Sequence, residues 1–182
     1  MRTYKTLALI IKRTNFSEAD RILTVFTKDQ GKIRVLAKGV RRITSKRGGN
    51  VELFNLTEIT LHEGKNFDLL TEAQVINSFP DLRTNLTTIG LCYHLCEIVD
   101  GLCPEREVYR RIFEEFVKTL ILLNTQPVTR NAQTISIFET FIIKELGFYP
   151  KDKELPIDKI DGILEELLER KLKSKSFLRK IA

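Results

Sequence analysis

The sequence predicts an α+β protein in two parts, a small five-stranded β-domain followed by a C-terminal α-helical domain. Two patterns along the chain support this prediction. Up to about residue 80, short segments alternate apolar and polar residues, which is typical of β-strands. After Pro80, apolar residues recur every three or four positions, which is typical of helices with one buried face. With 182 residues, of which 42% are hydrophobic, the chain can bury a substantial core.

The first part contains five candidate strands separated by sequences that favour turns, such as those at 28–31, 48–50 and 63–66. Five short strands within eighty residues favour a small barrel or sandwich. Phe26, Phe54 and Phe67 fall on these strands and are expected in the core, whereas Phe16 is expected in a loop. The candidate strands are residues 4–13, 21–27, 32–37, 51–62 and 67–79.

The second part contains four candidate helices. The third is expected to end at Gly147, with Pro150 beyond it, and the fourth to carry Pro156 in its first turn. We place the domain boundary near residue 80, which gives a β-domain at 1–80 and a helical domain at 81–182. The expected helices are residues 82–102, 107–124, 130–147 and 156–172.

The net charge of +6 is concentrated in the first part. Residues 1–80 carry 14 Lys and Arg against 8 Asp and Glu, whereas residues 81–182 carry 16 of each class. Within 28–47 there are eight basic residues and one acid, Asp29. The stretch KGVRRITSKRGG, residues 38–49, holds five basic residues and no acid, and it joins two expected strands. A second cluster, of six basic residues without an acid, begins at Arg170.

This distribution favours nucleic-acid binding, because Lys and Arg neutralise phosphates and mobile basic loops suit a polymer without fixed shape. A five-stranded Greek-key barrel of the OB-fold type with one basic face is a common solution for this task. The candidate phosphate contacts are Arg13, Arg21, Lys32, Arg34, Lys38, Arg41, Arg42, Lys46 and Arg47 in the β-domain and Lys171, Lys173, Lys175 and Arg179 near the end of the chain.

Each of these candidates also has a plain structural explanation. A basic run can be a solvated loop. Arg21 could pair with Glu18 or Asp20 and fix a turn, and basic residues that follow a helix are favoured by the helix dipole alone.

Catalytic and metal-binding chemistry is not expected. His62 and His94 lie far apart in sequence, and neither has a nucleophile at a useful spacing. On a helix Cys92 and Cys96 share a face from which His94 points away, so the three cannot meet at one ion. Gly48-Gly49 lacks the spacing of a phosphate-binding loop. We therefore expect no enzyme, no cofactor and no metal.

The three cysteines and the lack of a long apolar run indicate a cytoplasmic protein that has no membrane partner.

A series of short motifs resembles the N-terminal domain of the RecO family of DNA repair and recombination mediator proteins. The resemblance continues more weakly through residues 138–150 and 167–180. The motifs are Ser17-Glu18-Ala19-Asp20-Arg21, Phe26-Thr27, Gly31-Lys32, Ala37-Lys38-Gly39 with Arg41-Arg42, and Phe79-Pro80-Asp81-Leu82-Arg83.

The resemblance implies an OB-fold barrel followed by a helical domain, in a protein that binds single- and double-stranded DNA and anneals complementary strands. The implied partners are single-stranded DNA-binding protein, RecR, in some organisms RecF, and indirectly RecA, with a cytoplasmic, nucleoid-associated location. Many relatives carry a four-cysteine zinc module where this chain has only residues 151–156, so the module is expected to be absent. An RNA-binding or ribosome-associated barrel protein would share the charge pattern and stays an alternative.

Overall fold

The structure is a computed structural model that describes residues 2–45 and 47–181. The chain divides into two compact units. The barrel unit comprises Met1–Ser78 with Cys103–Arg110, and the helical unit comprises Phe79–Leu102 with Arg111–Ala182. The predicted α+β class with a β-part followed by a helical part is confirmed.

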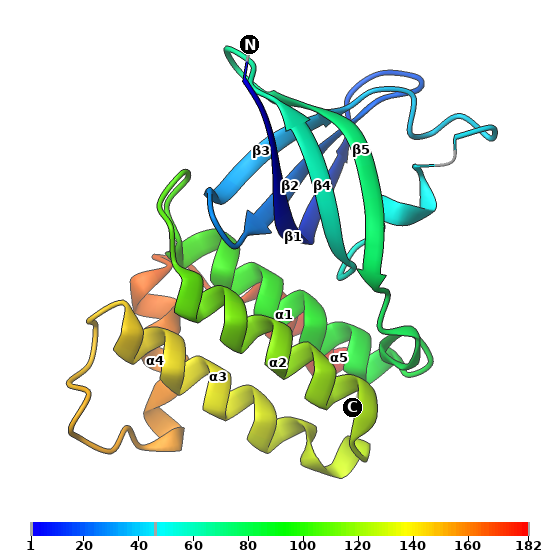
Figure 1. Cartoon of the computed structure of the whole chain (residues 1–182). Helices are drawn as coiled ribbons and strands as arrows, with labels where there is room; N and C mark the ends of the chain where they lie inside the picture. Colours follow the sequence, from blue (N-terminus) through cyan, green and yellow to red (C-terminus); the bar gives the residue numbers. More distant parts are fainter. Residues whose placement is uncertain (1, 46, 182) are drawn as a thin grey trace. The chain divides into compact units, whose positions relative to one another are not determined.

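The five strands of the barrel unit close in the order β1-β2-β3-β5-β4, as Figure 1 shows. All neighbouring pairs are antiparallel except β3 and β5, which are parallel. The predicted OB-type barrel is therefore confirmed. The strands are β1 (Thr3–Asn15), β2 (Arg21–Thr27), β3 (Gly31–Ala37), β4 (Leu56–His62) and β5 (Asp68–Asn77).

The fourth strand starts later than the sequence predicts. Residues 49–51 form a short 3-10 turn, and Phe54 adopts a left-handed backbone conformation with φ of 70° before β4 begins. Phe54 is still buried in the core. Along β4, the buried Ile59 and Leu61 alternate with partly exposed residues, as expected for a strand with one face on the core.

The barrel has a weak seam between β3 and β5, where only two residue pairs meet, Val35 with Asp68 and Leu36 with Leu69. Side chains of the β3–β4 connection supply the missing donors further along β5. Arg47 Nη1 donates to the carbonyls of Leu70 and Thr71 at 3.0 and 3.3 Å, and Asn50 Nδ2 donates to that of Ala73 at 2.8 Å. The connection therefore replaces part of a strand pairing.

Residues 103–110 lie along the start of β3, on the same edge of this strand that meets β5 near its end. Lys32 and Glu105 form a parallel bridge, and the Arg106 N–H donates to the Lys32 carbonyl at 2.8 Å. Gly31 has φ of 68°, and a Cβ there would lie 1.9 Å from the Glu107 carbonyl oxygen, so only glycine fits. The prediction that residues 107–109 belong to a helix is wrong, because these residues pack on the barrel instead.

The described part of the helical unit contains five α-helices rather than the predicted four. The last predicted helix ends early, and a separate helix follows it. Glu169, with φ of 52°, makes the break, and no glycine or proline signals it in the sequence. The helices are α1 (Leu86–Leu102), α2 (Arg110–Thr125), α3 (Asn131–Glu145), α4 (Ile157–Leu167) and α5 (Lys173–Ile181).

The predicted end of the third helix is confirmed at Gly147. Gly147 has φ of 83°, and its N–H donates to the Lys144 carbonyl while the N–H of Phe148 donates to that of Ile143. This pair of bonds satisfies carbonyls that the helix leaves without partners at its end.

The last helix packs closely on α1. A Cβ at Gly90 would lie 2.6 Å from Leu178 and 3.1 Å from Phe177, so the glycine allows α5 to approach. Within the described ranges, no helix is both long and apolar enough to cross a membrane.

Candidate nucleic-acid interface

The first half of the basic loop, which we define as residues 38–49, is fixed to the turn between β1 and β2. The Gly39 N–H donates to Asp20 Oδ1 at 2.8 Å, and the Arg41 N–H donates to the Ala19 carbonyl at 3.0 Å. The Arg41 guanidinium donates to the Ser17 carbonyl at 2.8 Å. Loop and turn therefore present one continuous surface at one end of the barrel.

Three predicted phosphate contacts, Lys38, Arg41 and Arg42, are exposed on this surface. The loop that carries them projects from the barrel in Figure 1, and their exposed charges are available to a polyanion. Lys46, also predicted, lies outside the described residues.

Arg47 has a different position from its neighbours. Besides its bonds to Leu70 and Thr71, its Nη2 donates to the Lys38 carbonyl at 3.0 Å. The guanidinium thus joins the end of the loop to β5 and to its own beginning. This geometry makes Arg47 a structural residue of the loop, so we remove it from the proposed phosphate contacts.

Arg13 and Arg21 both face Glu52. Arg13 Nη1 lies 2.5 Å from Glu52 Oε2, and Arg21 Nη1 lies 3.9 Å from Oε1. Their side chains are only 22% and 24% exposed. Glu52, rather than Glu18 or Asp20, is the acid that Arg21 meets, and it offsets part of the positive charge at this point.

Lys32 and Arg34 differ in their access to solvent. Lys32 is 8% exposed because residues 103–107 cover it, so it does not present its charge at the surface. Arg34 has a half-exposed side chain whose Nε lies 3.0 Å from Glu105 Oε1. The sequence could not anticipate this covering segment, which comes from seventy residues further along the chain.

Phe67 lies beside Arg34, and Phe16 lies beside Phe67. Phe67 is half-buried in the turn before β5 and is not a core residue on a strand, contrary to the prediction. Its ring meets that of Phe16, in the β1–β2 turn, edge to face with centroids 6.5 Å apart. The Arg34 guanidinium lies 5.4 Å from the centre of the Phe67 ring, and Phe16 remains 58% exposed.

In the helical unit, the four predicted basic contacts also separate into two groups. Lys171, Lys173 and Arg179 are exposed. Lys175 is instead held by two acids, since its ammonium forms ion pairs with Asp161 and, at 3.7 Å, with Glu139 Oε1. Lys175 therefore contributes little net positive charge to the surface.

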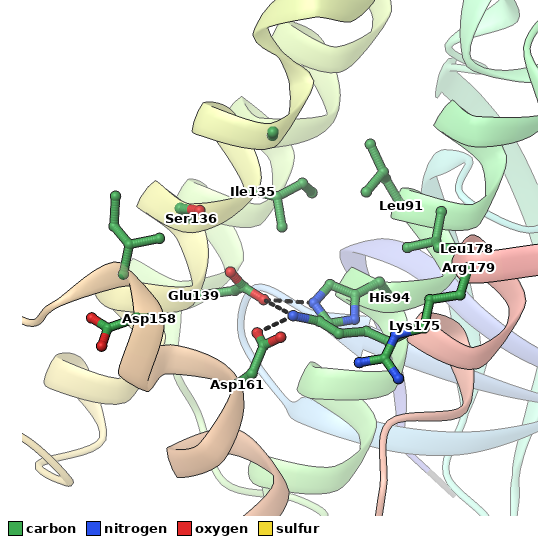
Figure 2. A pocket seen from close by; sticks show the side chains of 12 residues that line it. Leu91, His94, Ile135, Ser136, Glu139, Asp158, Asp161, Lys175, Leu178 and Arg179 are labelled. Atoms are coloured by element: carbon green, nitrogen blue, oxygen red, sulfur yellow. Dashed lines mark hydrogen bonds and ion pairs between the residues drawn. The ribbon is translucent and has the colours of Figure 1, made fainter. Parts of the chain in front are cut away.

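A buried polar network surrounds Lys175 in the pocket that Figure 2 shows. The pocket has a volume of about 430 Å³ and lies among α1, α3, α4 and α5. His94 Nε2 lies 2.7 Å from Glu139 Oε1, and His94 Nδ1 lies 2.9 Å from Ser174 Oγ. All three side chains are buried.

Ser174, His94 and Glu139 are the residue types of a catalytic triad, but their hydrogen bonds exclude that role. The Ser174 hydroxyl donates its proton to Glu97 Oε2 at 2.6 Å. Its oxygen must then accept from His94 Nδ1, so the imidazole cannot remove the hydroxyl proton. Among residues 2–45 and 47–181, no three His, Cys, Asp or Glu side chains are arranged to hold a metal ion.

The cysteines of α1 and the following turn are not reactive thiolates. Burial raises the pKa of Cys92 and of Cys103 to about 12, and it raises that of Cys96 well above its usual value. All three stay protonated at neutral pH and serve as small core residues.

Glu97 caps the start of α5. Its carboxylate accepts from the N–H groups of Lys173 and Ser174 at 3.0 and 2.9 Å and pairs with the Arg170 guanidinium. Burial alone would raise the pKa of Glu97, but the hydrogen bonds from Ser174, Arg170 and Lys173 outweigh it and lower the pKa to about 2.

This depressed pKa predicts that acid weakens the attachment of α5. The stabilisation is fully present above the ordinary pKa of about 4.5 and is lost as the pH falls towards 2, by about 1–2 kcal/mol after allowance for solvent screening. We expect Glu97→Gln to lower the melting temperature at pH 7 and to reduce its fall between pH 5 and pH 2.5. Glu154→Gln, at an exposed position, is the control, and an equal acid response in Glu97→Gln would contradict the prediction.

Comparison with known proteins gives consistent matches along the chain. Residues 1–79 match the family model described as Recombination protein O N terminal, and residues 83–151 match Recombination protein O C terminal. Among curated proteins, DNA repair protein RecO of Roseiflexus sp. (strain RS-1) is 35% identical over 150 residues, which are 82% of this chain and 52% of that protein.

Two further relatives carry the same name. RecO of Dehalococcoides mccartyi (strain ATCC BAA-2266) is 34% identical over 151 residues, 83% of this chain and 59% of the relative. RecO of Acetivibrio thermocellus is 33% identical over 150 residues, 82% of this chain and 59% of the relative. The matched region thus spans between half and three fifths of the length of these relatives.

Proposed function

The chain belongs to the RecO family of DNA repair proteins, and from this premise we propose that it is a DNA-binding recombination mediator. In this role it binds single- and double-stranded DNA, anneals complementary strands and assists RecA loading during recombinational repair. Its proposed location is the cytoplasm, in association with the nucleoid.

The observation that best supports DNA binding is the exposed group of Lys38, Arg41 and Arg42 on a loop that is fixed to the barrel. Charges held on a rigid support lose little conformational freedom when they meet phosphates. They carry no base information, so the same surface accepts any sequence. A sequence-independent grip is what annealing of arbitrary strands requires.

The proposed mechanism of annealing is electrostatic. Two complementary strands repel each other, and a protein that neutralises part of the phosphate charge lowers the cost of bringing them together. Lys171, Lys173 and Arg179 offer a second basic group in the helical unit for the same purpose. No covalent bond is formed or broken. The hydrogen bond that the Ser174 hydroxyl donates to Glu97 agrees with a non-enzymatic role.

The proposed protein partners are single-stranded DNA-binding protein and RecR, with RecF in some organisms and RecA indirectly. They follow from membership of the family. Since the chain covers 52–59% of the length of the compared relatives, these partners remain proposals for this chain.

An RNA-binding or ribosome-associated role is the second candidate, and one comparison separates the two. We expect the chain to bind labelled single-stranded DNA and to accelerate pairing of complementary DNA strands, also when single-stranded DNA-binding protein coats them. Titration with DNA and RNA of equal length and sequence measures the preference. Tighter binding of RNA, together with no effect on DNA pairing, would contradict the mediator role and favour the alternative.

A further inference from the structure

The pair of phenylalanines Phe16 and Phe67 is not explained by phosphate binding. Phe16 exposes 58% of its surface in the β1–β2 turn, and Phe67 supports it from the β4–β5 turn at 6.5 Å with planes at 63°. A single exposed aromatic residue is common on protein surfaces and needs no function. Here, however, the exposed ring has a second ring behind it, and a guanidinium lies over that second ring.

The support of Phe16 is rigid. The Phe16 N–H donates to the Asp20 carbonyl at 3.2 Å and closes the turn, while Asp20 itself accepts from Gly39. Behind it, Phe67 lies under the Arg34 guanidinium, whose Nε is held by Glu105 at 3.0 Å. The backbone of the turn and the ring behind Phe16 are thus fixed before any ligand arrives, so binding loses little conformational entropy.

The same turn connects this ring to the basic loop. Arg41 donates to the carbonyl of Ser17, the residue next to Phe16. A DNA strand whose phosphates contact Arg41 would therefore pass close to the exposed ring of Phe16. Bases of a single strand are unstacked and stack readily on aromatic side chains, whereas those of a duplex are already stacked on each other.

We propose that Phe16, supported by Phe67 and Arg34, is a stacking site for one base of single-stranded DNA. This inference rests on the proposed function and adds a preference for single strands over duplexes that the phosphate contacts cannot provide. The loops that follow the first and fourth strands are suitably placed for such a site in a barrel of this type.

Because the chain contains no tryptophan, Phe16→Trp creates a single fluorescent reporter at the proposed site. We expect its fluorescence to be quenched when a labelled single strand saturates the protein. Ile76→Trp is the matched control, because Ile76 is similarly exposed, at 54%, but lies at the far end of β5 from Phe67. Its fluorescence should stay nearly constant.

The energetic test compares an ordinary single strand with an abasic strand of equal length, which keeps the phosphates and lacks bases. We expect Phe16→Ala to lower affinity for the ordinary strand by at least about fivefold, the lower bound for one stacked base, and to leave the abasic strand unaffected. Ile76→Ala should change neither.

Binding with unchanged Phe16→Trp fluorescence, or equal losses on the two strands, would overturn the stacking site while leaving the proposed function intact. A wild-type chain that binds no DNA at low salt would overturn both.

Discussion

Replacing Lys38, Arg41 and Arg42 together with alanine is expected to lower the affinity for single-stranded DNA by about a hundredfold at 0.1 M salt. Each phosphate contact to a single strand contributes about 0.7 to the slope of log affinity against log salt, so three contacts contribute about 2. The slope should become shallower by this amount, and the loss should be alike for every sequence. Strand annealing should fall with it.

The variant should remain folded. All three side chains are exposed, and the bond that the Arg41 guanidinium donates to the Ser17 carbonyl lies at the surface. Substitutions of this kind usually change the free energy of unfolding by no more than about 0.5 kcal/mol each. A circular-dichroism melting curve close to that of the wild type would establish that lost binding is not lost structure.

A matched control separates local contacts from net charge. Replacing Lys118, Lys151 and Lys159 with alanine removes the same number of positive charges from exposed positions of the helical unit. We expect this variant to keep the affinity and the salt slope nearly unchanged. If both triple variants lost affinity equally, or neither did, the basic loop would be a solvated segment without a specific role.

The regular elements could be predicted from the sequence because their patterns are local. Alternation along Leu56–His62 and the three-to-four spacing along Leu86–Leu102 arise from the geometry of single strands and helices. The end of α3 could also be predicted, since glycine is the preferred residue where the chain leaves a helix in the left-handed backbone conformation, as it does at Gly147.

The errors in the fold prediction come from contacts between distant residues. Nothing near Glu107 indicates that it packs against Gly31, because the missing Cβ of Gly31 is what makes room for it. Likewise, the break at Glu169 is imposed by the packing of α5 and by the cap from Glu97, more than seventy residues earlier. The helix or strand propensity of a short segment does not reflect such contacts with distant residues.

The candidate site was predicted at the level of charge but not of individual roles. In the sequence, a loop arginine that is exposed to solvent, such as Arg42, cannot be distinguished from one that binds backbone carbonyls, such as Arg47. The contribution of Phe67 was missed for a related reason. Its predicted place on a strand suggested the core, and only the fold brings it to Phe16.

Arg47 gives the clearest test of this distinction. Its guanidinium donates to three backbone carbonyls, those of Leu70, Thr71 and Lys38, next to the seam where β3 and β5 share only two residue pairs. Hydrogen bonds that involve a charged group contribute roughly 1.5–3 kcal/mol each to the free energy of unfolding. Since this site is only partly buried, we expect Arg47→Ala to cost about 2–4 kcal/mol in total.

The expected result is a fall of about 4–16 °C in the melting temperature of the chain, at roughly 2–4 °C per kcal/mol for a protein of this size. Arg47→Lys should restore only a small part, because an ammonium group cannot reproduce the planar fork that meets carbonyls on two sides. Arg42→Ala, in the same loop but exposed, is the matched control and should melt like the wild type.

The salt dependence of DNA binding completes the argument for Arg47. If its role is structural, Arg47→Ala measured below its melting temperature should keep the slope of log affinity against log salt, whereas Arg42→Ala should lose about 0.7 of it. The two single variants should therefore each lose a different property. Arg47→Ala should lose stability and keep the salt slope, and Arg42→Ala should lose salt slope and keep stability. A loss of slope without a loss of stability in Arg47→Ala would show that the guanidinium leaves its carbonyls to meet a phosphate, and that the seam is closed by β3, β5 and Asn50 without it.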